Sequence, residues 1–174
     1  MIVYEFLFVS ISVAYLVTDL LYICCLCSWF SERMDTMTDL EIARGHLDSG
    51  SYTCVVCKGD CLHFATARGV RPLLDWLDAG VDMHGFSAAD KVVGRATAFL
   101  YALLGVSEVY ANVMSRPAAQ VLQAHGIAAH WGKLVDGIIN RKGTGPCPFE
   151  ETVMDITDAT EALTAIRRKM AQMS

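Results

Sequence analysis

Apolar side chains recur at helical spacing at the start of the region that follows residue 37. Leu40, Ala43 and Leu47 are three and four residues apart. This spacing places the three side chains on one face of a helix. The Thr38-Asp-Leu-Glu41 segment has the pattern of a capping box, in which a hydroxyl and a carboxylate bond the first free amides of a helix. The pattern therefore predicts a helix that begins near Thr38.

Strand-forming residues dominate the next segment. Tyr52–Cys57 and Cys61–Phe64 contain mainly β-branched, aromatic and cysteine residues, and the Lys58-Gly-Asp60 tripeptide separates them. A glycine in such a short connection supplies the positive φ that a tight hairpin needs. The segment therefore predicts a β-hairpin.

The hairpin also carries residue types that bind zinc, namely Cys54, Cys57, Cys61 and His63. Side chains that are three residues apart along a strand point to opposite faces of the sheet. We therefore expect Cys54 and Cys57 to diverge, which argues against a zinc site in the hairpin.

From Pro72 onward, helical and strand patterns alternate. The longest predicted helix begins at a second capping box, Ser87-Ala-Ala-Asp90, and ends at Gly105. A hairpin followed by alternating helices and strands predicts an α/β fold with three layers, a mixed sheet in the middle and helices on both faces. The other predicted elements are helices that start at Pro72, Ser115, Pro148 and Asp158, and strands over Glu108–Val113 and Ile127–Trp131.

The first 36 residues have a different character. They are mostly apolar, but Glu5, Thr18 and Asp19 interrupt the run. A spanning helix needs about 20 apolar residues, and a central Asp is costly in lipid. Three interpretations stay open: translation begins at Met34 or Met37, the segment is a membrane anchor, or it is a signal peptide. We therefore divide the chain into an apolar leader, 1–36, and a single domain, 37–174.

Charge and cysteine content limit the classes of partner and indicate the cellular compartment. The net charge is −5 and the isoelectric point is near 5.4, and no basic stripe is present. This balance excludes a nucleic-acid partner, because phosphate binding needs clustered cations. The seven cysteines are an odd number in a chain long enough to form its own core. They predict reduced thiols and a cytoplasmic protein, or a membrane-anchored one if the leader is translated.

Two blocks of sequence are specific enough to indicate a family. They are Gly85-Phe-Ser-Ala-Ala-Asp-Lys91 and Gly143-Thr-Gly-Pro-Cys-Pro148. With shorter matches they cover nearly everything from Met37 onward. The chain resembles a family of bacterial and archaeal proteins that is catalogued only as a domain of unknown function. The resemblance implies a cytidine-deaminase-like fold.

The sequence departs from that fold's zinc enzymes at the metal site. A zinc deaminase has His-x-Glu or Cys-x-Glu at one helix start and Pro-Cys-x-x-Cys at the next. The corresponding segments here are Ala88-Ala89-Asp90 and Arg116-Pro-Ala-Ala-Gln120. Ala88, Ala118 and Val121 cannot bind a metal, so we expect neither a metal nor another cofactor.

Cys147 and Asp90 are the candidate catalytic residues. A thiol at a helix N-terminus has a stabilised thiolate and gains nucleophilicity, and the Pro148 helix places Cys147 there. Asp90 is in the position of the deaminase general acid and base, which gives it a proton-transfer role. The structural alternatives stay open: Cys147 as a half-buried small residue and Asp90 as a capping carboxylate.

A ligand pocket is expected beside these two residues. Gly143-Thr-Gly145 precedes a helix start, where backbone amides favour an anion. We expect the pocket to hold a small anionic or nucleoside-like ligand. Its predicted lining is Ser87, Lys91, Asn140, Arg141, Thr144, Gly145 and Glu150.

Two hypotheses for the function follow. In the first, the protein is a metal-independent ligand-binding protein, and any catalysis uses a cysteine nucleophile. In the alternative, it is a non-catalytic regulatory or interaction module that has lost the zinc chemistry. Under both hypotheses the chain can form a homo-oligomer. The sequence leaves open whether it is an enzyme.

Overall fold

The computed structural model of the protein describes residues 37–173, so the predictions for the leader lie outside the described residues. The chain from Asp39 onward forms one compact unit. Within the described residues, no helix is both long and apolar enough to cross a membrane. The described helices are α2 Asp39–Ser49, α3 Arg71–Asp78, α4 Arg95–Leu104, α5 Arg116–Ala124, α6 Pro148–Thr152 and α7 Ala159–Met173, and the strands are β1 Cys54–Lys58, β2 Cys61–Ala65, β3 Ser87–Val93, β4 Glu108–Ser115 and β5 Ala128–Val135.

The five strands form one mixed sheet in the order β2-β1-β3-β4-β5. Strands β1 and β2 pair antiparallel as the predicted hairpin, and Gly59 takes a φ of 55° in its turn. Strand β1 also pairs antiparallel with β3, whereas β3, β4 and β5 run parallel to one another. Helices α4 and α5 join the parallel strands, because parallel neighbours need a crossover connection.

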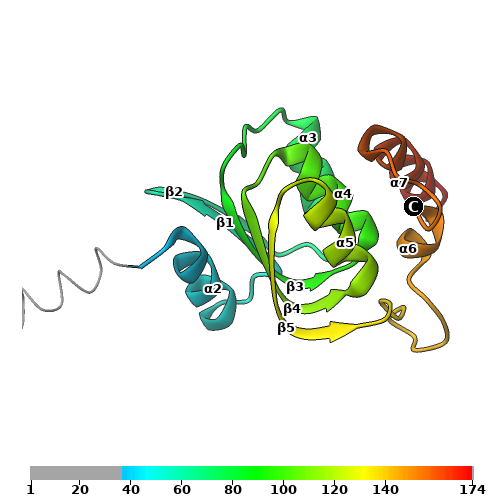
Figure 1. Ribbon diagram of the computed structural model, residues 1–174, viewed down its shortest axis with the longest axis horizontal. Coiled ribbons are helices and arrows are strands. Elements are labelled where there is room, and N and C mark those ends of the chain that lie inside the picture. Colours follow the sequence, from blue (N-terminus) through cyan, green and yellow to red (C-terminus); the bar gives the residue numbers. More distant parts are fainter. Residues whose placement is uncertain (1–36, 174) are drawn as a thin grey trace, which may run out of the picture. The chain divides into compact units, whose positions relative to one another are not determined.

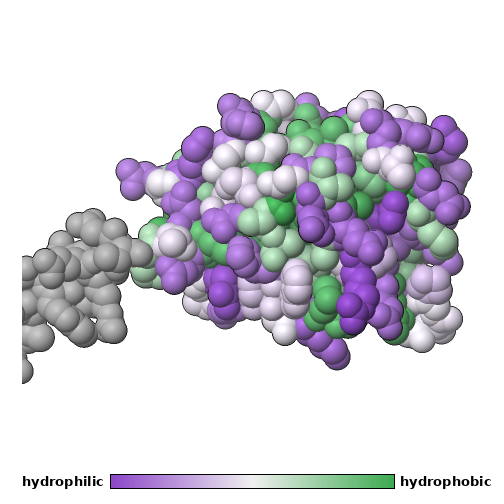
Figure 2. All heavy atoms as spheres, in the orientation of Figure 1, coloured by the Kyte–Doolittle hydropathy of each residue, from purple (hydrophilic) through white to green (hydrophobic). Residues whose placement is uncertain are grey.

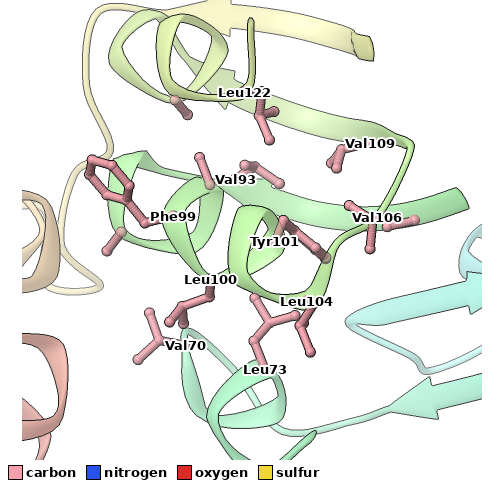
Figure 3. Packing of buried hydrophobic residues seen from close by; sticks show 14 of the residues in the cluster. Val70, Leu73, Val93, Phe99, Leu100, Tyr101, Leu104, Val106, Val109 and Leu122 are labelled. Atoms are coloured by element: carbon pink, nitrogen blue, oxygen red, sulfur yellow. The ribbon is translucent and has the colours of Figure 1, made fainter. Parts of the chain in front are cut away.

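Helices cover both faces of this sheet, which confirms the predicted layers (Figure 1). Among the described helices, α2 is the one on the first face, where Ala43 and Leu47 pack against Val55, Cys57 and Ala89. Helices α3, α4, α5 and α7 lie on the other face and enclose the larger core. Figure 3 shows Phe99, Leu100, Tyr101 and Leu104 of α4 between the sheet and the neighbouring helices.

The hairpin cysteines point as expected. Cys54 belongs to the larger core and Cys57 to the core under α2, so the two thiols lie on opposite faces of the sheet. Among residues 37–173, no three side chains of the types His, Cys, Asp and Glu are grouped so that they could hold a metal ion.

The predicted helix from Ser87 to Gly105 is wrong in its first half. Ser87–Val93 is strand β3, and the helix begins only at Arg95, after Gly94 in an extended conformation. The two alanines favour a helix locally, but β3 lies between β1 and β4, where both faces are covered. Burial on both faces accepts a continuous run of small and apolar residues as a strand. The Ser87-Ala-Ala-Asp90 pattern therefore belongs to a strand and does not cap a helix.

The last strand is longer than predicted. It runs over Ala128–Val135 instead of ending at Trp131, and it forms one edge of the sheet. The chain then passes through a loop into α6 and α7, and α7 packs on α4 through Ala162 and Ile166.

Candidate functional site

Asp90 lies inside the protein, in the middle of β3. Its Oδ2 accepts a hydrogen bond of 2.9 Å from the Tyr101 hydroxyl of α4, and its Oδ1 accepts one of 2.9 Å from the Val92 amide. The Tyr101 oxygen also lies 3.0 Å from the Cys54 sulfur of β1. Asp90 is only 9% exposed. The residue is thus part of a buried Cys54–Tyr101–Asp90 network and does not lie at a helix start.

Burial sets the protonation of this network. It raises the pKa of Asp90 to about 6, although the hydrogen bonds from Val92 and Tyr101 partly oppose the shift. Burial also raises the pKa of the Tyr101 hydroxyl and of the Cys54 thiol above their usual values, and the nearby Asp90 charge adds to both shifts. At neutral pH the Cys54 thiol therefore donates to the Tyr101 oxygen, and the Tyr101 hydroxyl donates to Asp90.

The network joins three elements of the fold. Cys54 and Asp90 are paired across β1 and β3, and Tyr101 reaches them from α4. A satisfied polar network of this kind fixes one register and one helix position. The geometry explains Asp90 as a structural group.

Glu150 has a more exposed position, at the carboxyl edge of the parallel strands. Its Oε1 accepts from the Arg95 amide at 3.0 Å and from the Ser115 hydroxyl at 2.6 Å. Its Oε2 accepts from the Ile138 amide at 2.6 Å. These three donors follow or end β3, β4 and β5 in turn. One carboxylate of α6 therefore holds the ends of all three parallel strands.

Two glycines make room for the Glu150 carboxylate. A Cβ at Gly94 would lie 3.0 Å from Glu150 Oε1 and 3.1 Å from Ile138 Cγ1, and a Cβ at Gly137 would lie 3.5 Å from Oε2. The Ser115 oxygen, besides donating to Glu150, accepts from the Ala118 amide and caps α5. The site is thus shaped around an internal carboxylate.

The predicted loop residues bond mainly to one another. Asn140 Oδ1 accepts from the Lys142 and Thr144 amides at 3.0 and 3.2 Å, and its Nδ2 donates to the Thr144 hydroxyl at 3.3 Å. The Gly145 carbonyl accepts from the Asn140 amide at 2.8 Å, and Arg141 is exposed. The loop closes on itself beside the sheet edge.

Cys147 precedes α6, as predicted, and is half-buried. Its amide donates to the Ile138 carbonyl at 2.7 Å, which fixes the backbone of the helix start. The helix has only five residues, so its dipole is short. The two predicted catalytic residues have separate surroundings, since Cys147 contacts the loop after β5 and Asp90 contacts Tyr101 within the core.

Ser87 and Lys91 lie in strand β3, whereas the other predicted ligand residues lie in the loop after β5 and in α6. The Ser87 hydroxyl donates to Glu108 Oε1 at 2.7 Å, at the amino end of the parallel strands. Lys91 is exposed in β3, and its amide donates to the Thr53 carbonyl at 3.0 Å. The structure thus spreads the predicted ligand residues over two ends of the sheet.

A hollow of about 450 Å³ opens on the α2 face of the sheet, over β4 and β5. We call it the α2-side hollow. Helix α2 packs mainly on β1 and β3 and covers β4 only in part, through Arg44 over Tyr110. The hollow is lined by Leu40, Arg44, Tyr110, Ala129, His130, Trp131 and Gly132.

A stacked cation is the main chemical feature of this hollow. The Arg44 guanidinium carbon lies 3.9 Å from the centre of the Tyr110 ring, which is a cation–π contact. The Tyr110 hydroxyl passes close to Gly132, where an added Cβ would lie 3.2 Å from it. His130 Nε2 lies 3.5 Å from Glu108 Oε2. A positive charge, an aromatic ring and a histidine therefore meet in one open depression.

A family model described as a domain of unknown function (DUF1893), with TM1506 as its name, matches residues 42–170. The chain belongs to the DUF1893 family. This finding confirms the resemblance to a family of unknown function that the two sequence blocks indicate. The crystal structure of the DUF1893 protein TM1506 from Thermotoga maritima has a TM-score of 0.70 and 21% identity to this chain. The match covers 75% of this chain and 89% of that one, and at this identity it shows a shared fold. No curated protein matches the chain.

Sequence reasoning missed the α2-side hollow in this DUF1893 domain. Arg44 is four residues after Leu40, so it lies at the border of the apolar face of α2. Tyr110 and His130 are paired only because β4 and β5 are neighbours. The helical spacing of Arg44 could have been noticed, but its aromatic partner depends on the order of strands in the sheet.

Proposed function

We propose that this protein binds a small anionic, nucleoside-like ligand in the α2-side hollow without a metal. The observation that carries the proposal is the Arg44 guanidinium stacked 3.9 Å over Tyr110 at the wall of an open depression. One face of the guanidinium meets the Tyr110 ring, and Arg44 is otherwise exposed. Its opposite face is thus available to a second flat ring.

The neighbouring groups suit a flat ligand that carries an anion. Guanidinium N–H groups bond phosphate or carboxylate oxygens in the plane of the group while its faces stack on rings. His130 adds a second donor to the lining of the hollow. The exposed guanidinium face suits the ring of a nucleotide-like molecule, which a simple inorganic anion lacks.

We also propose that the fold is cytidine-deaminase-like. The support is the antiparallel hairpin at one end of a mixed sheet, followed by parallel strands and helices on both faces. At the starts of α4 and α5, where zinc deaminases hold their metal, this chain has Gly94-Arg95-Ala96 and Ser115-Arg116-Pro117. The one carboxylate there, Glu150, is already bonded to three protein donors. These residues do not fit a zinc ion.

Cysteine-based catalysis has weaker support than ligand binding. Asp90 is engaged by Tyr101 and Val92 within the core, so a reaction at Cys147 would proceed without it. The second candidate function, a non-catalytic interaction module, is favoured by the number of predicted site residues whose bonds hold the fold together. These residues are Ser87, Asp90, Asn140 and Glu150.

The test is a titration of the full-length chain with adenosine 5′-monophosphate, in which protein NMR or calorimetry measures binding. Adenosine and ribose 5-phosphate serve as probes that lack the anion or the ring. Arg44→Ala should weaken binding about tenfold, because a stacked cation contributes on the order of 1 kcal/mol. Arg141→Ala removes the same charge from the predicted loop and should leave the affinity unchanged.

Two results would contradict the proposal. If Arg141→Ala lost binding and Arg44→Ala kept the wild-type affinity, the site would lie at the loop. No binding of any of the three probes at millimolar concentration would support the interaction module instead.

A further inference from the structure

The two edges of the sheet differ in how they are protected. Strand β2, at one edge, has five residues, and Phe64 in it packs against Tyr52. Strand β5, at the other edge, has eight residues and no proline. Most of its side chains are exposed, and Trp131 is 44% exposed. Long, exposed edge strands present unpaired backbone groups that can pair with another chain.

The surface near β5 favours pairing along the edge over docking on a flat face. In Figure 2, hydrophobic residues are scattered among hydrophilic ones, without one broad apolar area on the face that is shown. An exposed tryptophan on a strand edge is a typical anchor of an interface. Pairing through the backbone needs no large apolar patch.

Symmetry restricts how two copies of β5 can pair. In an antiparallel pair with a twofold axis, one residue of the strand lies opposite its own copy, at the axis. Residues equally far from the axis on either side lie opposite each other. In a strand, Trp131 and Lys133 share a face, and Gly132 lies between them. If the axis passes at Gly132, each Trp131 lies directly opposite Lys133 of the second copy.

This register has a favourable charge arrangement. It gives both lysines an aromatic ring as cross-strand neighbour, so the pair contains two cation–π contacts. Placing the axis at Trp131 or His130 would instead set Lys133 opposite Ala129 or beyond the end of the paired segment. Gly132 at the axis also has no side chain to hinder the approach of the two backbones.

We propose that β5 is a self-association edge, where a second copy of this chain pairs antiparallel about a twofold axis at Gly132. The two sheets then form one continuous ten-stranded sheet, twice the five strands of one copy. The proposal does not depend on the ligand. Pairing uses the backbone groups of the β5 edge, and although Trp131 also lines the α2-side hollow, Lys133 is not one of its lining residues.

Disulfide trapping tests the register. Trp131→Cys and Lys133→Cys are prepared separately in the full-length chain, mixed, oxidised mildly and digested for peptide mass spectrometry. Directly opposite cross-strand residues have Cβ atoms about 4.5–5.5 Å apart, close enough for a disulfide after a small adjustment. The mixture should give a disulfide that joins the introduced thiol of one variant to the introduced thiol of the other. Each variant alone should give no disulfide between two copies of its own introduced thiol.

Sedimentation velocity tests the association without introduced thiols. The dimer dissociation constant should rise about tenfold in Lys133→Glu, because the cation over Trp131 is lost. Lys142→Glu makes the same charge change in an exposed loop and should leave the dissociation constant unchanged.

Three outcomes would overturn the proposal. The wild-type chain could sediment as a monomer at every concentration. A disulfide between two copies of Trp131→Cys, formed through the introduced thiols, would show a different register. An equal effect of Lys133→Glu and Lys142→Glu would show that net charge, and not the β5 edge, controls association.

Discussion

Asp90 and Glu150 are two carboxylates with opposite consequences for the fold. Asp90 lies in the core, where its partners are the Tyr101 hydroxyl and the Val92 amide. Glu150 lies at the sheet edge, where it accepts from two backbone amides and a hydroxyl. The core removes water from Asp90 and raises its pKa to about 6. Burial thus makes the ionised form of Asp90 destabilising at neutral pH, whereas three converging donors make Glu150 a clamp that stabilises the ends of the parallel strands.

The largest expected effect is that of Glu150→Ala. The variant leaves the Arg95 amide, the Ser115 hydroxyl and the Ile138 amide without their acceptor, and each unsatisfied donor costs about 1–3 kcal/mol. We expect a loss of about 4 kcal/mol in the free energy of unfolding, measured by urea denaturation. Glu151→Ala, at the exposed neighbouring position, should cost under about 0.5 kcal/mol. Equal costs would show that Glu150 is not a clamp.

The second prediction concerns the pH dependence that Asp90 causes. Its folded pKa of about 6 lies above the value of 3.8 for a solvated carboxyl, so the folded state holds the proton more firmly. The stabilisation of the folded state by this bound proton is complete below about pH 3.8 and is lost as the pH rises through about 6. The free energy of unfolding should fall by about 3 kcal/mol in all. Urea denaturation from pH 4 to pH 8 should show this fall in the wild type and lose it in Asp90→Asn.

A matched control separates Asp90 from the other carboxyls. Asp155→Asn changes an exposed aspartate and should keep the wild-type pH profile. A profile that is the same in Asp90→Asn and in the wild type would mean that Asp90 is solvated in the folded protein.

The smallest expected effect is that of Tyr101→Phe. This variant removes one hydroxyl from the buried network and should cost about 1–2 kcal/mol. Because the hydroxyl stabilises the ionised form of Asp90, the cost should be larger at pH 7.5 than at pH 5. Tyr110→Phe, outside the network, should show no such difference. A cost in Tyr101→Phe that is independent of pH would separate the hydroxyl from Asp90.

Much of the architecture could be predicted from local patterns. The hairpin of β1 and β2, the strand β4 and the helices α5 and α7 follow from β-forming residues, glycine turns and caps that act over a few residues. The prediction was wrong where local preference opposed burial. Ala88 and Ala89 favour a helix, but the pairing of β3 with both β1 and β4 makes them a central strand.

The candidate site was harder to predict, for a related reason. A Ser-x-x-Asp pattern looks the same whether it caps a helix or lies in a strand, and only the neighbouring elements decide where Ser87 and Asp90 point. The Arg44–Tyr110 contact joins α2 to β4 across 66 residues of sequence. No spacing rule covers such a distance.

The sequence by itself determined the family, the mixed α/β layers and the positions of most turns, because these depend on residue type and short-range spacing. Only the tertiary structure decided which polar groups are buried, which donors converge on Glu150 and which sheet edge stays open. The physical reason is that desolvation and hydrogen bonding depend on what surrounds a side chain, and chain segments far apart in the sequence supply those surroundings.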